Sequence, residues 1–448
     1  MGYGDVGCFN GGLSRTPTLD QLVAEGLCLG QHYSASPVCA PARASLLTGR
    51  YPHRTGAVDT LEHRGLDRIA LRERTVGDLL RGAGYVTGLV GKWHNGAFDD
   101  RFHPNARGFD EFVGFSGGWM PYWDWRLDRN GTTSKADGRY LTDVLTEEAV
   151  AFIRRHRHER FFLHLSYNAP HYPFEAPDAE AAPFAETGVT SAVAAIYGMI
   201  RRMDSGVAAV LDELERCGLI DDTLVMFTSD NGPQFGGDGD YCTERFNCGL
   251  RGAKGVVYEG GVRLPMVLRW PNGLAAGGER HELVHFTDWL PTLLAVAGAD
   301  PPSELRLDGV DVSPLLRGEP AEVPPQRFWQ WNRYTPVPSC DAAMRDGRWK
   351  LVRPALPEAM AVAPLDLLLD VDLRTNQGAR TEVVDDPEPP RTLGEPAPAE
   401  LYDIEADPLE EHDLAALEPA RVANMDDQLA RWFEEVEADR LAGATATR

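Results

Sequence analysis

The sequence predicts an α/β protein with a mixed sheet flanked by helices, followed by a smaller C-terminal antiparallel sheet with one helix. Short apolar runs alternate with helical sequence, as the buried strands of α/β sheets do; the runs span residues 85–90, 161–167 and 223–229. Near residue 320 a Pro- and Glu-rich linker interrupts the chain, and strand-like runs joined by the turn signal Asp346-Gly347 follow it. The predicted domains are residues 1–322 and 323–448.

The helices are predicted from apolar periodicity and from their end signals. Residues 18–26 form a short helix with a Thr18/Gln21 capping box, and a helix around residues 75–81 ends at two glycines. The longest helix covers residues 196–214, whose apolar residues recur at spacings of three and four and form a stripe that faces the core. An acidic, Pro-rich surface loop at 384–400 precedes an amphipathic helix from about residue 418 to 440.

Composition limits the classes of function. The 448 residues, 43% of them apolar, are enough for a large core. The net charge of −24 argues against binding nucleic acid, and no apolar run is long enough to span a membrane. The seven cysteines contain no C-x-x-C pair and their number is odd, so we expect no disulfide framework and no Cys242–Cys248 bond.

Polar residues follow each of the three strand-like runs. Lys92 and His94 come after the first run, His171 after the second, and Asp230 and Asn231 after the third. In α/β sheets, ligands bind beyond the carboxyl ends of the strands. We therefore expect these residues to lie in one site, although each alone is more typical of a turn or a solvated surface.

The segment SPVCAPARASLLTGR at residues 36–50 carries the most specific chemistry. A helix is predicted to begin just after Cys39, with Pro41 at its first position and Gly49 at its end. This places Cys39 at a helix N-terminus, where free N–H groups and the helix dipole favour an anion. Arg43 adds a guanidinium one turn later. Taken singly, the two residues are more typical of a buried cysteine and an exposed arginine.

The string C-A-P-A-R followed by S-L-L-T-G-R resembles the signature of the type I sulfatases, in the alkaline phosphatase superfamily. The resemblance implies an alkaline phosphatase-like mixed sheet and covers nearly the whole chain, least clearly across 354–400. In that family a maturation enzyme converts the cysteine of C-x-P-x-R to formylglycine, whose hydrated aldehyde is the nucleophile. The resemblance implies that Cys39 is the formylglycine precursor and that the other catalytic residues are Arg43, Lys92, His94, His171 and Lys254.

The resemblance also implies a divalent metal, Ca²⁺ with Mg²⁺ or Mn²⁺ as alternatives, held by modified Cys39, Asp230 and Asn231. Family members carry two further Asp ligands at the end of a strand before the segment that resembles residues 2–5. Here Met1 stands just after that place, so we expect it to be an internal methionine or a wrongly assigned start. The alternative is a truncated chain with an incomplete metal site.

The chain opens without a signal peptide, as a cytoplasmic protein does. A leader in an upstream segment would instead direct it to the periplasm or outside the cell.

The implied activity is hydrolysis of an aryl or carbohydrate sulfate ester. Asp230 and the metal would activate the nucleophile, His171 or Lys254 would protonate the leaving oxygen, and His94 would remove the proton that lets sulfate be expelled. The alternatives are a phosphodiesterase or phosphonate monoester hydrolase of the same superfamily, and an inactive binding protein.

The aromatic segment from Trp119 to Trp125 bears on the substrate. It is either a wall on which a substrate ring stacks, through Trp123 or Trp125, or a loop packed onto the domain.

Overall fold

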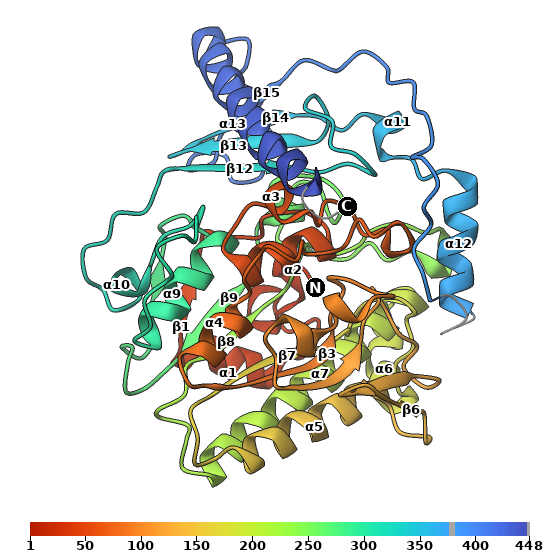
Figure 1. Ribbon diagram of the computed structural model, residues 1–448, viewed down its shortest axis with the longest axis vertical. Helices are drawn as coiled ribbons and strands as arrows, with labels where there is room; N and C mark the ends of the chain where they lie inside the picture. Colours follow the sequence, from red (N-terminus) through yellow and green to blue (C-terminus); the bar gives the residue numbers. More distant parts are fainter. Residues whose placement is uncertain (376–380, 446–448) are drawn as a thin grey trace.

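The computed structural model describes residues 1–375 and 381–445 (Figure 1). Its mixed α/β architecture confirms the predicted fold class. One five-stranded sheet has the order β6 (Thr132–Lys135), β5 (Arg126–Arg129), β4 (Glu111–Phe115), β3 (Val86–Lys92) and β7 (Phe161–Ser166). β3 runs parallel to both β4 and β7, and the remaining pairs are antiparallel.

The described part of the chain forms three further sheets. A four-stranded sheet has the order β10 (Glu279–Arg280), β1 (Leu27–Leu29), β9 (Met266–Arg269) and β8 (Val225–Thr228). A two-stranded sheet pairs β11 (Val284–His285) with β2 (His32–Tyr33). The C-terminal sheet is antiparallel, in the order β12 (Gln326–Gln330), β13 (Ala342–Asp346), β14 (Trp349–Arg353) and β15 (Glu400–Asp403).

The helices lie between and around these sheets (Figure 1). They are α1 (Pro17–Glu25), α2 (Cys39–Thr48), α3 (Pro52–Thr55), α4 (Val76–Gly82), α5 (Leu141–Arg155), α6 (Asp178–Ala185), α7 (Ser191–Arg216), α8 (Glu259–Val262), α9 (Trp289–Val296), α10 (Ser313–Leu316), α11 (Pro357–Met360), α12 (Pro364–Thr375) and α13 (Pro419–Thr445). Within the described residues, no helix is both long and apolar enough to cross a membrane.

The capping box predicted at the start of α1 is wrong. The helix begins one residue earlier, with Pro17 in its first turn, so Thr18 lies inside it. The backbone N–H groups of Thr18 and Leu19 instead donate to the carboxylate of Asp204 on α7, at 3.0 and 2.8 Å. A carboxylate from a distant helix thus satisfies the N-terminal donors that a local side chain usually accepts.

The start of α2 differs from the prediction in one detail. Cys39 is itself the first helical residue, so Pro41 is the third rather than the first. Gly49 ends the helix with a φ of 67°, a left-handed conformation that favours glycine.

The three predicted strands are confirmed as β3, β7 and β8, but only β3 is buried nearly throughout. β7 and β8 are half-buried, because each is the last strand of its sheet and has one strand neighbour. Leu163 of β7, Phe227 of β8 and Val207 of α7 are only partly buried where they pack against the same core cluster. The C-terminal half of the predicted α7 stripe is therefore less buried than its N-terminal half, which includes Ile196 and Ile200.

The predicted C-terminal sheet and helix are confirmed. Gly347 turns the β13–β14 hairpin with a φ of 58°. α13 lies across the sheet (Figure 1) and buries Leu429, Trp432 and Val436 against Met344 and neighbouring residues. The domain division at residue 322 stays a prediction.

A buried ion-pair cluster joins this sheet to the larger part of the molecule. The ammonium of Lys350 on β14 lies 2.9 Å from Glu259 of α8 and 2.8 Å from Glu410. All three side chains are shielded from solvent, so the two carboxylates compensate the one buried cation.

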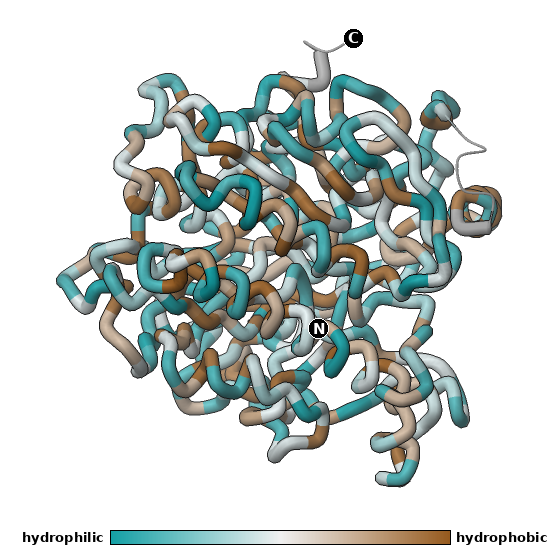
Figure 2. The backbone as a smooth tube through the Cα atoms, turned by 90° about the horizontal axis from the view of Figure 1, so that it is seen from below, coloured by the Kyte–Doolittle hydropathy of each residue, from teal (hydrophilic) through white to brown (hydrophobic). Residues whose placement is uncertain are grey.

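α12 carries apolar side chains at the surface. Leu365, Leu367, Leu368 and Val371 are each at least half exposed. Figure 2 colours the backbone by hydropathy, and both brown (hydrophobic) and teal (hydrophilic) segments lie at the periphery of that view.

Candidate active site

The side chain of Cys39 is buried at the first residue of α2. Burial alone would raise the pKa of its thiol. The nearby Lys92, Lys254 and His94 outweigh burial and hold the pKa of Cys39 well below its ordinary value. The predicted cation-rich setting for this residue is therefore present, and it favours an anion at position 39.

Arg43 connects the ends of the neighbouring strands β3 and β7 to the loop after β8. Its Nε donates to the backbone oxygen of Trp93 at 3.0 Å, and its Nη2 donates to the backbone oxygen of Lys92 and to Ser166 Oγ. Its Nη1 lies 3.6 Å from a carboxylate oxygen of Asp230. Ser166 was not predicted, because a serine at a strand end has no local signal.

Lys254 and His171 form a close pair. Lys254 Nζ lies 3.2 Å from His171 Nε2, and His171 Nδ1 lies 2.9 Å from the backbone oxygen of Tyr172. Burial, Lys254 and Lys92 lower the pKa of His171 well below its ordinary value, so the ring is neutral. Because Nδ1 faces a carbonyl, it carries the hydrogen, and Nε2 accepts a hydrogen bond from the Lys254 ammonium.

His94 is buried in a left-handed backbone conformation, with a φ of 53°. Its Nε2 lies 3.4 Å from the backbone oxygen of Thr60, and its Nδ1 has no hydrogen-bond partner among the described residues. Within the described structure Nδ1 is thus left without a backbone partner, while the ring as a whole helps to lower the pKa of the Cys39 thiol.

Two buried acids near His94 were missed by the sequence analysis. Burial raises the pKa of Glu62 to about 7, although His94 opposes the shift. Burial likewise raises the pKa of Asp67, whose Oδ2 accepts from the backbone N–H of Gly96 at 3.0 Å. Neither acid belongs to a recognisable motif, and only the fold brings them to the histidine.

The residues predicted to hold a metal suit a hard divalent cation. Burial disfavours the charged form of Asp230, but Lys92 and Arg43 outweigh it and lower the pKa of this carboxyl, so it is ionised. Asn231 is buried; its Nδ2 donates to the backbone oxygen of Gly232 at 2.8 Å. Its Oδ1 has no partner among the described residues. An ionised carboxylate and an unpartnered amide oxygen are ligands that Ca²⁺ or Mg²⁺ accepts.

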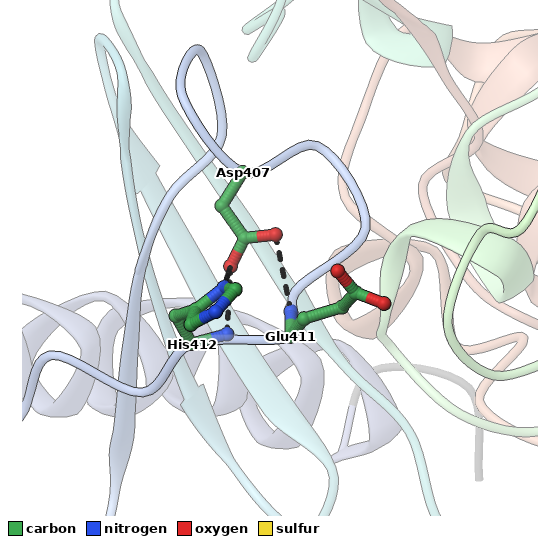
Figure 3. Close-up of side chains that lie close together, drawn as sticks. All are labelled: Asp407, Glu411 and His412. Carbon is green, nitrogen blue, oxygen red and sulfur yellow. Dashed lines mark hydrogen bonds and ion pairs between the residues drawn. The ribbon is translucent and has the colours of Figure 1, made fainter.

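A second cluster with metal-ligand side chains lies elsewhere, at Asp407, Glu411 and His412 (Figure 3). Asp407 accepts hydrogen bonds from the backbone N–H groups of Glu411 and His412, at 3.1 and 2.8 Å. Glu411 and His412 are exposed. The carboxylate of Asp407 therefore stabilises this loop, and the cluster takes no part in the site around Cys39.

The seven cysteines are free, in agreement with the prediction that Cys242 and Cys248 do not pair.

Comparison with known proteins identifies similar sequences and structures. The profile of the sulfatase family matches residues 1–299, and that of the N-sulphoglucosamine sulphohydrolase C-terminal region matches residues 252–362. Human N-acetylgalactosamine-6-sulfatase is 35% identical over 358 residues, which are 72% of this chain and 65% of that protein. Human arylsulfatase A is 35% identical over 388 residues, 78% of this chain and 72% of that protein.

Among solved structures, Ps i-CgsB in complex with k-i-k-neocarrahexaose superposes with a TM-score of 0.79 at 30% identity. The match covers 96% of this chain and 90% of that one. The chain thus spans about two thirds of the length of N-acetylgalactosamine-6-sulfatase and most of the length of this solved structure.

Proposed function

Because the chain belongs to the sulfatase family of the alkaline phosphatase superfamily, we propose that it hydrolyses the sulfate ester of an aryl or carbohydrate alcohol. The observation that carries the proposal is the grouping of Arg43, Lys92 and Lys254 around Cys39 in a chain whose net charge is −24. A strongly acidic protein repels anions at long range, so a pocket of cations within it is specific for a local anionic group. The sulfate group of a sulfate ester is such an anion.

The proposed reaction uses two groups that the family implies. Formylglycine, made from Cys39 by a formylglycine-generating maturation enzyme, supplies an aldehyde hydrate as the nucleophile. A divalent cation, Ca²⁺ by preference over Mg²⁺ or Mn²⁺, would be held by residue 39, Asp230 and Asn231, and would supply a Lewis acid for a sulfate oxygen.

Residues of the chain itself provide the remaining hydrogen bonds and proton transfers. Lys92 and Arg43 donate to the sulfate oxygens as their charge increases in the transition state. Lys254 protonates the leaving oxygen, since neutral His171 accepts one of its hydrogens at Nε2 and so fixes the direction of the ammonium. Nδ1 of His94 takes a proton from the side chain at position 39, because it is buried without another partner in the described structure.

The test joins a mass measurement to a comparison of substrates. The chain is expressed with and without a formylglycine-generating enzyme, and the mass of the Cys39 peptide is measured. Rates are then compared on 4-nitrophenyl sulfate, 4-nitrophenyl phosphate and a phenylphosphonate monoester, with added Ca²⁺ and with Cys39→Ser as the control. We expect an aldehyde at position 39 and the highest rate on the sulfate.

Two results would contradict the proposal. A higher rate on the phosphonate or phosphate ester would assign the alternative hydrolase activity. Absence of turnover from protein that carries the aldehyde and Ca²⁺ would favour an inactive binding protein.

A further inference from the structure

Two aromatic side chains, Trp119 and Tyr172, meet in the loops after β4 and β7, and we call this pair the aromatic platform. Their ring centroids lie 6.0 Å apart and their planes are tilted by 53°. Tyr172 is 48% exposed and also contacts Phe174 edge-on, with centroids 5.7 Å apart. A large aromatic side chain that remains half exposed while packing against two loops is available to bind a ligand ring.

The two loops of the platform also carry contacts to two catalytic candidates, His94 and Lys254. Gly118, the residue before Trp119, packs so closely on His94 that a Cβ there would lie 2.7 Å from the ring carbon Cε1. Tyr172 directly follows His171, whose Nδ1 contacts the Tyr172 backbone oxygen and whose Nε2 contacts Lys254. The loop that carries Trp119 therefore packs on the proposed base, and the loop that carries Tyr172 also carries His171, which contacts the proposed acid.

Buried neighbours fix both loops of the platform. The hydroxyl of Tyr122 donates to the backbone oxygen of His171 at 3.0 Å, and Asn168 Nδ2 donates to the backbone oxygen of Met120 at 3.1 Å. Tyr122, Met120 and Asn168 are all buried. A ring surface held in place before binding loses little conformational entropy when a ligand stacks on it.

Of the two tryptophans predicted to stack on a substrate ring, Trp125 does not serve that purpose, and Trp123 packs on a neighbouring ring outside the platform. Trp125 is 1% exposed, and its Nε1 donates to the backbone oxygen of Arg139 at 2.9 Å, so it is a core residue. Trp123 is 44% exposed but packs on Tyr140, with centroids 5.0 Å apart. For Trp125 the second alternative, a loop packed onto the domain, is confirmed.

We propose that Trp119 and Tyr172 form the leaving-group subsite, on which the ring that carries the sulfate ester stacks. The ligand class is a sulfate ester with a flat ring face, either aromatic or pyranose. This inference rests on the proposed function, because Lys254, which contacts His171 in the loop that carries Tyr172, is the residue assigned to the leaving oxygen. Rings that lie next to that residue would hold the alcohol in line for proton transfer.

The experiment compares ring and open-chain sulfate esters in matched variants. Trp119→Ala and Tyr172→Ala are tested beside Tyr172→Phe, which keeps the ring, and Trp123→Ala, which removes an exposed ring outside the platform. The substrates are 4-nitrophenyl sulfate, a sulfated monosaccharide and butyl sulfate. We expect kcat/KM on a ring substrate to fall about tenfold in each platform variant, a typical loss for one stacking contact, while butyl sulfate changes less than about twofold.

The two ring substrates distinguish an aromatic leaving group from a pyranose. A larger loss on 4-nitrophenyl sulfate indicates an aromatic leaving group, and a larger loss on the sulfated sugar indicates a pyranose. Equal losses on ring and open-chain substrates, or no loss on either ring, would overturn the proposal.

A binding measurement separates failure of the subsite from failure of the proposed function. In a Cys39→Ala background, which has no nucleophile at position 39, calorimetry gives the Kd of 4-nitrophenyl sulfate and of inorganic sulfate. We expect Trp119→Ala to raise the Kd of 4-nitrophenyl sulfate about tenfold and to leave the Kd of inorganic sulfate unchanged. An unchanged Kd for 4-nitrophenyl sulfate would contradict the subsite even if the wild-type protein hydrolyses sulfate esters. A Kd for this ligand that is about tenfold higher would support the subsite even if turnover is absent.

Discussion

Lys254 is held by a neutral histidine, and this contact determines how its proton is used. We predict that Lys254→Met lowers kcat about 100-fold or more on sulfate esters of weakly acidic alcohols. The loss on 4-nitrophenyl sulfate should be far smaller, because nitrophenolate leaves without being protonated. Steady-state kinetics on both substrates measures the difference, with Lys135→Met on exposed β6 as the control. Equal losses on the two substrates would instead assign Lys254 to sulfate binding.

Glu62 makes stability depend on pH. The pKa of its carboxyl is about 7 in the folded protein against an ordinary value of 4.5, so between these values the folded state holds a proton that the unfolded chain has lost. The contribution of Glu62 to stability therefore falls as pH rises from 4.5 to 7, by up to about 3 kcal/mol. We predict that Glu62→Gln, which has no charge to bury, gains stability relative to wild type between pH 5 and pH 8.

Urea unfolding at pH 5 and pH 8 measures this gain, and Glu358→Gln, at an exposed position, is the control. A difference between Glu62→Gln and wild type that stays constant with pH would show that Glu62 is already ionised when folded.

At the scale of single residues, the sequence predicted the residues that belong to a motif and missed those that do not. Cys39 and Arg43 lie within five residues of each other in a specific string, so their proximity was certain before folding. Ser166 reaches Arg43 from 123 positions away. Such a contact depends on the parallel pairing of β3 with β7, which no short string specifies.

At the scale of elements, α1 depends on a carboxylate from another helix. We predict that Asp204→Ala lowers the free energy of unfolding by about 1–3 kcal/mol, because it leaves the N–H groups of buried Leu19 and half-buried Thr18 without acceptors. Asp204→Asn, which keeps one acceptor oxygen, should cost less. Urea denaturation of both variants, with exposed Asp212→Ala on the same helix as control, tests the cap. Equal stability of Asp204→Ala and Asp212→Ala would contradict it.

The elements that carry strong local signals were predicted well. The strands β3, β7 and β8 and the helices α2, α4, α7 and α13 lie close to their expected positions, because apolar periodicity and glycine stops act within a few residues. The capping box of α1 failed because the same Thr-x-x-Gln spacing occurs one residue inside a helix that Pro17 already begins.

At the scale of the whole molecule, the buried Lys350 connects the C-terminal sheet to the larger part of the protein. We predict that Lys350→Met lowers the free energy of unfolding by about 3–5 kcal/mol, since buried Glu410 would lose its cation and buried Glu259 would keep only the more distant Arg263 among its described ion pairs. Chemical denaturation measures the loss. The triple variant Lys350→Met with Glu259→Gln and Glu410→Gln should recover part of it, and failure to recover would mean that packing rather than charge explains the loss.

The sequence predicted the α/β class and the C-terminal antiparallel sheet, but not how the strands divide between sheets. β1 pairs with β9 and β10, which lie more than 200 residues later in the chain. Alternation of apolar and polar residues identifies a strand, yet it does not say which distant strand will be its neighbour. Only the packing of the whole chain decides that.

The half-buried edge strands β7 and β8 also affect how the protein behaves in concentrated solution. An edge strand presents backbone N–H and C=O groups that another chain can pair with, and β7 adds the apolar side chains of Phe161, Leu163 and Leu165. The net charge of −24 opposes such contacts by repulsion between copies. Because salt screens this repulsion and leaves the apolar attraction in place, we predict that light scattering from the protein increases as salt is added. The colloidal stability of the protein then depends on the balance between its net negative charge and the two strand edges.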